Sequence, residues 1–84
     1  MPTIAIVDGV TIMIYPRDHQ PPHIHAKYAE FECLLRIYNG EKLRGDLPTK
    51  KFEAVQNWLE IHRRDVAFAW EEMRQGRSIK GYIK

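Results

Sequence analysis

The sequence has little of what builds a covalently braced or membrane-bound protein. Its one cysteine, Cys33, excludes an internal disulfide framework and a zinc site made of several cysteines. No apolar run approaches the ~20 residues that span a bilayer. The N-terminal residues also lack the basic region and long apolar stretch of a secretory signal. We therefore expect a cytoplasmic protein with no membrane partner.

Net charge is small as well. The 13 basic and 11 acidic residues give a formal charge of +2, so affinity for nucleic acid does not follow from composition. Apolar residues make up 44% of the chain and charged residues 29%, which is typical of a folded domain and not of a disordered chain. Residues 1–84 should form one domain with a thin core, and this favours a homodimer or a tightly bound partner.

Residues 1–45 have the pattern of consecutive β-hairpins. Two strand-like runs flank Asp8-Gly9, a dipeptide that favours a two-residue turn because both positions take positive φ. That turn would pair Val7 with Val10. At the end of this part of the chain, Asn39-Gly40 predicts a further turn. A strict two-residue turn would place Leu43 opposite Arg36, on the polar face of the sheet. A bulge at Gly40 would return Leu43 to the apolar face, so the register of this hairpin stays open.

The middle hairpin joins residues 23–28 to residues 31–38 through Ala29-Glu30. Both runs alternate between apolar and polar residues, as half-buried strands do. Opposite charges across the strands support a two-residue turn. That turn sets four pairs opposite each other: Ile24 with Leu35, Ala26 with Cys33, Lys27 with Glu32, and His23 with Arg36.

A helix is predicted over residues 48–76, after which residues 77–84 form an extended tail. The helix carries one apolar stripe without a phase break. Its members are Phe52, Val55, Trp58, Leu59, His62, Val66, Ala69, Trp70 and Met73. The stripe is longer than most globular helices, so we expect a kink near residues 63–65. The sequence thus predicts an α+β fold, with an antiparallel sheet of four to five strands and one long or kinked C-terminal helix packed on it.

The strongest chemical signal is the run Asp18-His19-Gln20-Pro21-Pro22-His23-Ile24-His25. Strand alternation places His23 and His25 on one face, with their rings within ~8 Å of each other. Imidazoles bind transition metals, and a metal held by His19, His23 and His25 is one reading. The chain has no H-E-x-x-H or multi-cysteine pattern, so we expect no resident metal or other cofactor.

Without a metal, clustered histidines can act as general acid and base. His23 and His25 would move protons, and Arg36 would stabilise the negative charge that develops on a phosphodiester. The residues expected to bind the substrate or partner are Asp18, His19, Lys27 and Tyr28. A structural reading stands beside this one, in which His23 and His25 bond the backbone and fix the Pro21-Pro22 loop.

The remaining notable residues are expected to be structural. Cys33 lies on the apolar strand face, where a small buried side chain is expected and a nucleophile is not. His62 lies on the helix stripe and should be partly buried. Trp58 and Trp70 are expected in the core or at an interface with another chain.

The sequence resembles domain-of-unknown-function family 4160 over nearly its whole length. The resemblance is carried by Met1-Pro2-Thr3-Ile4, the histidine–proline run extended to Ala26, Gly45-Asp46-Leu47-Pro48, and Trp58-Leu59-Glu60-Ile61-His62-Arg63 followed by Trp70. It implies a small bacterial protein, often encoded beside a member of family 2442, in a suggested toxin–antitoxin pair. It implies no catalytic residue. Members often have glycine at Ala29, and because alanine tolerates positive φ poorly we expect a different or longer turn there.

Two function classes therefore remain open, and the sequence does not decide whether the protein is an enzyme. One is an RNA-cleaving toxin that uses His23, His25 and Arg36. The other is a binding module, whose partner is a neighbour-encoded protein or a nucleic acid and whose histidines are structural or metal-binding. The histidine run favours the first class, and the small net charge favours the second.

Overall fold

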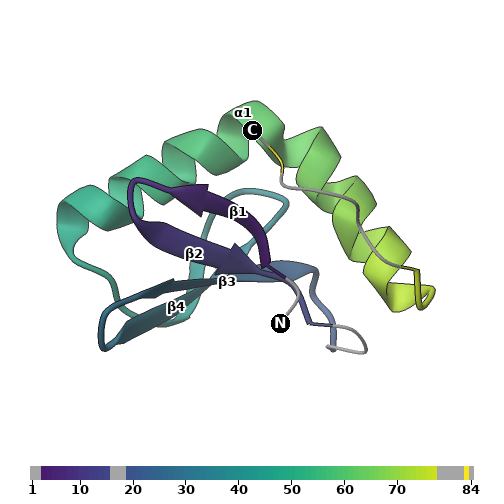
Figure 1. Cartoon of the computed structure of the whole chain (residues 1–84), viewed down its shortest axis with the longest axis horizontal. Helices are drawn as coiled ribbons and strands as arrows, with labels where there is room; N and C mark the ends of the chain where they lie inside the picture. Colours follow the sequence, from purple (N-terminus) through teal and green to yellow (C-terminus); the bar gives the residue numbers. More distant parts are fainter. Residues whose placement is uncertain (1–2, 16–18, 78–82, 84) are drawn as a thin grey trace.

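The computed structural model describes residues 3–15, 19–77 and 83. Five strands precede one helix along the chain. They are β1 (Thr3–Val7), β2 (Val10–Met13), β3 (His23–Tyr28), β4 (Phe31–Arg36), β5 (Lys42–Gly45) and α1 (Thr49–Arg74). The strands form one antiparallel sheet in the order β1-β2-β3-β4-β5, with α1 along one side (Figure 1). The predicted α+β class and strand number are confirmed.

The first two hairpins have the predicted registers. Asp8 (φ 50°) and Gly9 (φ 81°) both take positive φ, and Val7 pairs with Val10. All four predicted pairs between β3 and β4 are present. Ala29 takes φ 54° in a turn of only two residues, so the expectation of a longer turn is wrong. A left-handed backbone costs an L-residue about 1–2 kcal/mol of conformational free energy. The pairing of β3 with β4 on either side of the turn holds Ala29 in this conformation.

The third hairpin has the bulge that the sequence requires, but not at the predicted position. Leu34 pairs with Arg44, whereas the next residue of β4 pairs with Lys42, so Leu43 is the extra residue. The predicted bulge at Gly40 is therefore displaced into β5. This displacement directs Arg44 toward the sheet face that carries the histidines.

Helix α1 is shorter than predicted by one residue at its start and two at its end. His62 has non-helical angles (φ −108°, ψ 18°), so the predicted kink is confirmed one residue ahead of its expected range. Beyond the kink the helix bends past the end of the sheet (Figure 1). Gly76 (φ 82°) ends it in a Schellman motif, in which the N–H groups of Gly76 and Arg77 donate to the carbonyls of Met73 and Glu72.

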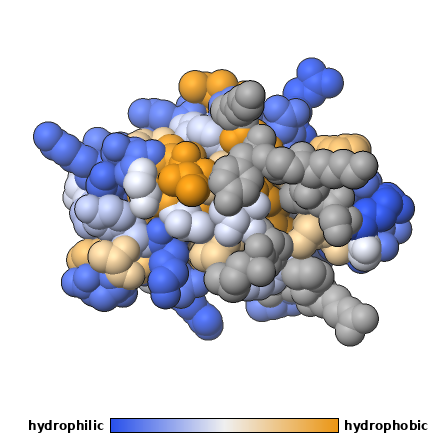
Figure 2. All heavy atoms as spheres, in the orientation of Figure 1, coloured by the Kyte–Doolittle hydropathy of each residue, from blue (hydrophilic) through white to orange (hydrophobic). Residues whose placement is uncertain are grey.

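The core lies between α1 and one face of the sheet. Its fully buried large aliphatic residues are Ile4, Val10, Ile12, Ile14, Ile24, Leu35, Val55, Leu59 and Val66. Burying each such side chain contributes about 1.5–3 kcal/mol. The predicted helix stripe supplies six buried residues, and Phe52 and Trp58 pack against the cluster from its margin. Apolar side chains also stand at the upper margin of the surface in Figure 2, where Figure 1 places α1.

Of the predicted tail, the structure describes Arg77 and Ile83, and residues 78–82 and 84 lie outside the described part. The N–H of Ile83 donates to the carbonyl oxygen of Ile4 at 2.7 Å. Ile83 therefore lies beside β1. Among the described residues, no helix combines the length and the apolar character that a membrane span requires.

Candidate active site around three histidines

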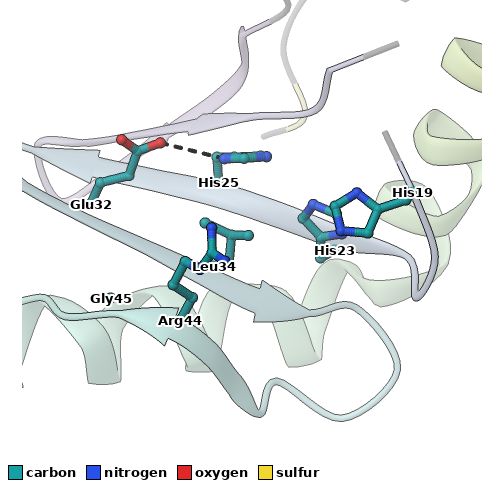
Figure 3. A pocket seen from close by; sticks show the side chains of 7 residues that line it. All are labelled: His19, His23, His25, Glu32, Leu34, Arg44 and Gly45. Atoms are coloured by element: carbon teal, nitrogen blue, oxygen red, sulfur yellow. Dashed lines mark hydrogen bonds and ion pairs between the residues drawn. The ribbon is translucent and has the colours of Figure 1, made fainter. Parts of the chain in front are cut away.

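Three histidine rings lie side by side at the start of β3. The ring centroids of His23 and His25 are 5.1 Å apart, which confirms the prediction that they share a face. The ring of His19, in the preceding loop, is centred 5.9 Å from that of His23 (Figure 3). The two-residue alternation of β3 sets the first distance, and the proline-containing loop sets the second.

His23 is the buried member of the group, with only 2% of its surface exposed. Its Nδ1 donates to the carbonyl oxygen of Pro21 at 2.7 Å, and the indole ring of Trp70 is centred 5.3 Å away. This bond satisfies a buried polar atom and places the proton on Nδ1. The contacts of His23 match the structural reading of the sequence, because they join the loop to β3 and to the second half of α1.

His25 is more accessible and has a carboxylate partner. Its Nδ1 lies 3.4 Å from Oε2 of Glu32, on the neighbouring strand β4. The ring of Tyr15 meets it edge-on at 4.6 Å. Figure 3 shows the second ring nitrogen of His25 directed away from Glu32, toward the side where His23 lies. A carboxylate at Nδ1 favours the tautomer in which Nδ1 carries the proton.

The histidines line a hollow of about 370 Å³ on the sheet face. Its lining residues are His19, His23, His25, Glu32, Leu34, Arg44 and Gly45 (Figure 3). A second hollow of about 210 Å³ continues from it toward Pro21 and Leu43. The guanidinium of Arg44 and the N–H groups of the imidazoles can bind an anion, and the Glu32 carboxylate belongs to the same lining.

The structure separates the histidines from several predicted site residues. Arg36 is the strand partner of His23, but its Nη1 lies 3.5 Å from Oε1 of Glu41 and the side chain does not line the hollow. Lys27 is exposed further along β3, also outside the hollow. Asp18 lies outside the described residues.

Tyr28 faces the other side of the sheet. The Nζ atom of Lys51 lies 4.8 Å from the centre of its ring, and the ring packs against the core. Alternation along β3 requires this, because Tyr28 shares its face with Ile24 and Ala26.

Sequence reasoning did not place Glu32, Leu34, Arg44 or Gly45 in the site. Glu32 and Leu34 could have been found, because alternation along β4 puts both on the face opposite Cys33. Arg44 could not, because its facing depends on the bulge at Leu43.

Within the described ranges, no three side chains of His, Cys, Asp or Glu are arranged to hold a metal ion, and Asp18, which the sequence offers as a further ligand, lies outside those ranges. His19, His23 and His25 are close together, but they are not arranged as a set of three ligands.

Cys33 is fully buried in the core, on the side of β4 that faces away from the histidine hollow. Burial is the largest cause and raises the pKa of its thiol from 9.0 to about 11, while the charge of Lys42 acts in the opposite direction. The thiol is thus protonated at neutral pH and is not a nucleophile. The expectation of a buried, structural cysteine is confirmed.

The family model described as a domain of unknown function, DUF4160, matches residues 9–71. This range contains the three histidines, the lining of the hollow and the kink in α1. No curated protein and no solved structure has a detectable match to the chain. The match covers most of the sequence, and the chain belongs to the DUF4160 family.

Proposed function

We propose that the protein cleaves RNA without a metal ion, as the toxin of a toxin–antitoxin pair. The observation that carries this proposal is the His25–Glu32 pair, in the same hollow as Arg44 and His19. Cleavage of an RNA phosphodiester needs a base for the attacking hydroxyl, an acid for the leaving oxygen and a cation for the negative charge that develops on the phosphate. The hollow contains one group of each kind.

In the proposed step, Nε2 of His25 takes the proton of a ribose 2′-hydroxyl. The 2′-oxygen attacks the adjacent phosphorus, and the bond from phosphorus to the 5′-oxygen breaks. His19 gives its proton to that 5′-oxygen. The products are a 2′,3′-cyclic phosphate and a 5′-hydroxyl, and one proton is taken for each proton given. Glu32 stabilises the imidazolium form of His25 while it holds the proton.

Arg44 takes the role that the sequence assigned to Arg36. Its guanidinium can pair with two phosphate oxygens at once, which a planar fork does better than a lysine. Because β5 is an edge strand and Arg44 is exposed, a chain-like substrate can reach it. His23 becomes a positioning residue, because its ring stands next to both other imidazoles and its bond to Pro21 holds the loop that carries His19.

The test uses the purified full chain and a short single-stranded RNA, with EDTA present. We expect cleavage products that end in a 2′,3′-cyclic phosphate, detected by mass spectrometry. His25→Ala and Arg44→Ala should each slow cleavage by roughly 10²–10⁴-fold. Lys50→Ala, which removes an exposed cation from α1, is the matched control and should cleave normally. Absence of cleavage by the wild type, or full activity in folded His25→Ala, would overturn the proposal.

A second candidate is a binding module without catalysis. The burial of His23 and its bond to Pro21 favour it, because these contacts give part of the histidine run a structural role. The same purified protein distinguishes the two functions. A module would bind RNA or a neighbour-encoded protein and leave the RNA intact, and Arg44→Ala would then weaken binding without any change in products.

A further inference from the structure

The outer surface of α1 carries two large apolar side chains that the core does not use. Ile61 is 76% exposed and Phe68 is 64% exposed. They lie seven positions apart, one on each side of the kink at His62, and they share the lining of one hollow. Together with His62, Arg64 and Asp65 they surround a shallow hollow of about 500 Å³ beside the kink. None of these residues lines the histidine hollow.

This face is chemically symmetric along the helix. Arg64 follows Ile61 by three residues, and Phe68 follows Asp65 by three residues. A two-fold axis between Arg64 and Asp65 would place each charge opposite the other sign on a second copy. The same axis would place Ile61 opposite the second copy's Phe68. Isologous interfaces require self-complementarity of this kind, in which each contact occurs twice.

We propose that two copies of the chain pair through this face, with their α1 helices antiparallel. The hollow at the kink, lined by both apolar side chains, His62 and the two charged residues, provides a recess for the aromatic ring of the other copy. The ring of His62 packs against that of Trp58, with centroids 5.2 Å apart, so the His62 side of the recess is restrained.

The charges favour a second copy over a polyanion or a strongly charged protein. Arg64 and Asp65 cancel each other, so the face has no net charge of its own. Among the described residues, neither side chain has an ion-pair partner in the monomer. Arg64 and Asp65 both find partners only on a surface that places an acidic residue opposite Arg64 and a basic residue opposite Asp65. A second copy related by the two-fold axis provides this arrangement.

Sedimentation equilibrium of the full chain tests the pairing. A contact between two helices lies at the small end of protein interfaces, so we expect a dissociation constant of about 1–100 µM. R64E places two carboxylates opposite each other, and D65R places two guanidinium groups opposite each other. Each substitution should weaken the dimer by about tenfold or more. The double variant R64E/D65R should restore it, because both pairs re-form with exchanged signs.

The most decisive experiment mixes the two single variants, R64E and D65R. In a heterodimer of R64E with D65R, both charge pairs are attractive, although each variant repels its own copy. Mixing two monomeric proteins should therefore produce a dimer. Ile61→Asp and Phe68→Asp should also weaken the wild-type dimer. Tyr38→Ser, which changes a residue 80% exposed elsewhere on the surface, is the control and should leave it unchanged.

All five positions are exposed or on the helix surface, so circular dichroism should show unchanged folding for every variant. A wild-type chain that remains monomeric at about 200 µM, above the expected constant, would overturn the proposal. So would a dimer whose constant is the same in R64E, in D65R and in their mixture.

Discussion

Gly45 lies so close to the backbone of Glu32 that a Cβ atom on it would overlap the Glu32 carbonyl oxygen. That oxygen accepts the N–H of Asp46 at 3.1 Å, and Gly45 itself has φ 77°. The contact fixes the end of β5 against β4, and both residues line the histidine hollow. Glycine is needed here for two separate reasons, the lack of space and the left-handed backbone.

We predict that Gly45→Ala lowers the free energy of unfolding by about 2–4 kcal/mol, from strain in φ and overlap with the backbone. For a domain of this size the melting temperature should fall by roughly 10–25 °C. Gly76→Ala is the matched control. It has φ 82°, and no atom of the described residues lies within 4 Å of the added Cβ, so it should cost only about 1–2 kcal/mol. Equal losses in the two variants would show that the close approach to Glu32 does not contribute.

The fold could be predicted well because its determinants are local. Asp8-Gly9 fixes one hairpin by turn chemistry, and the alternation from His23 onward fixes another by its pairing with β4. The kink was predicted from the length of the stripe. Ala29 was misjudged because the cost of positive φ at a single residue is smaller than the gain from six paired residues on each strand.

The site could be predicted only in part, for a comparable reason. The His23–His25 relation follows from strand periodicity and was predictable. The choice between Arg36 and Arg44 was not, because both are cations on neighbouring strands and one inserted residue, Leu43, decides which lines the hollow. The burial of His23 under Trp70 joins positions 47 residues apart in the chain, and no local pattern indicates it.

We predict that His23 and His25 differ in their contributions to stability. His23→Ala removes a buried ring and its bond to Pro21, and should lower the free energy of unfolding by about 2–4 kcal/mol. His25→Ala, at a more exposed position, should cost less than about 1.5 kcal/mol. Chemical denaturation of both variants measures this. If His23→Ala is as stable as His25→Ala, the positioning role assigned to His23 is wrong.

We predict that Glu32→Gln reduces RNA cleavage more than it reduces stability. The amide oxygen can still accept from Nδ1 of His25, but it no longer stabilises the charged imidazolium. The rate should fall by roughly 10–100-fold, while the melting temperature shifts little, because Glu32 is exposed. Single-turnover cleavage beside thermal denaturation separates the two effects. Lys27→Gln, on the strand residue that pairs with Glu32, controls for a general loss of charge. An unchanged rate in Glu32→Gln would remove the carboxylate from the mechanism.

Cys33 should make stability depend on pH in the alkaline range. Burial raises its pKa from 9.0 to about 11, so the folded state holds the proton more tightly than the unfolded state does. Its contribution to stability is complete below pH 9 and is lost as the pH rises from 9 to 11. The full loss amounts to about 2–3 kcal/mol.

Because lysines and tyrosines titrate in the same range, the quantity to measure is the difference in unfolding free energy between the wild type and Cys33→Ala. That difference should be constant between pH 6 and 8 and shrink toward pH 11 (~2 units above the unperturbed pKa). A difference that stays constant to pH 11 would mean that the thiol ionises as readily in the folded chain as in the unfolded one.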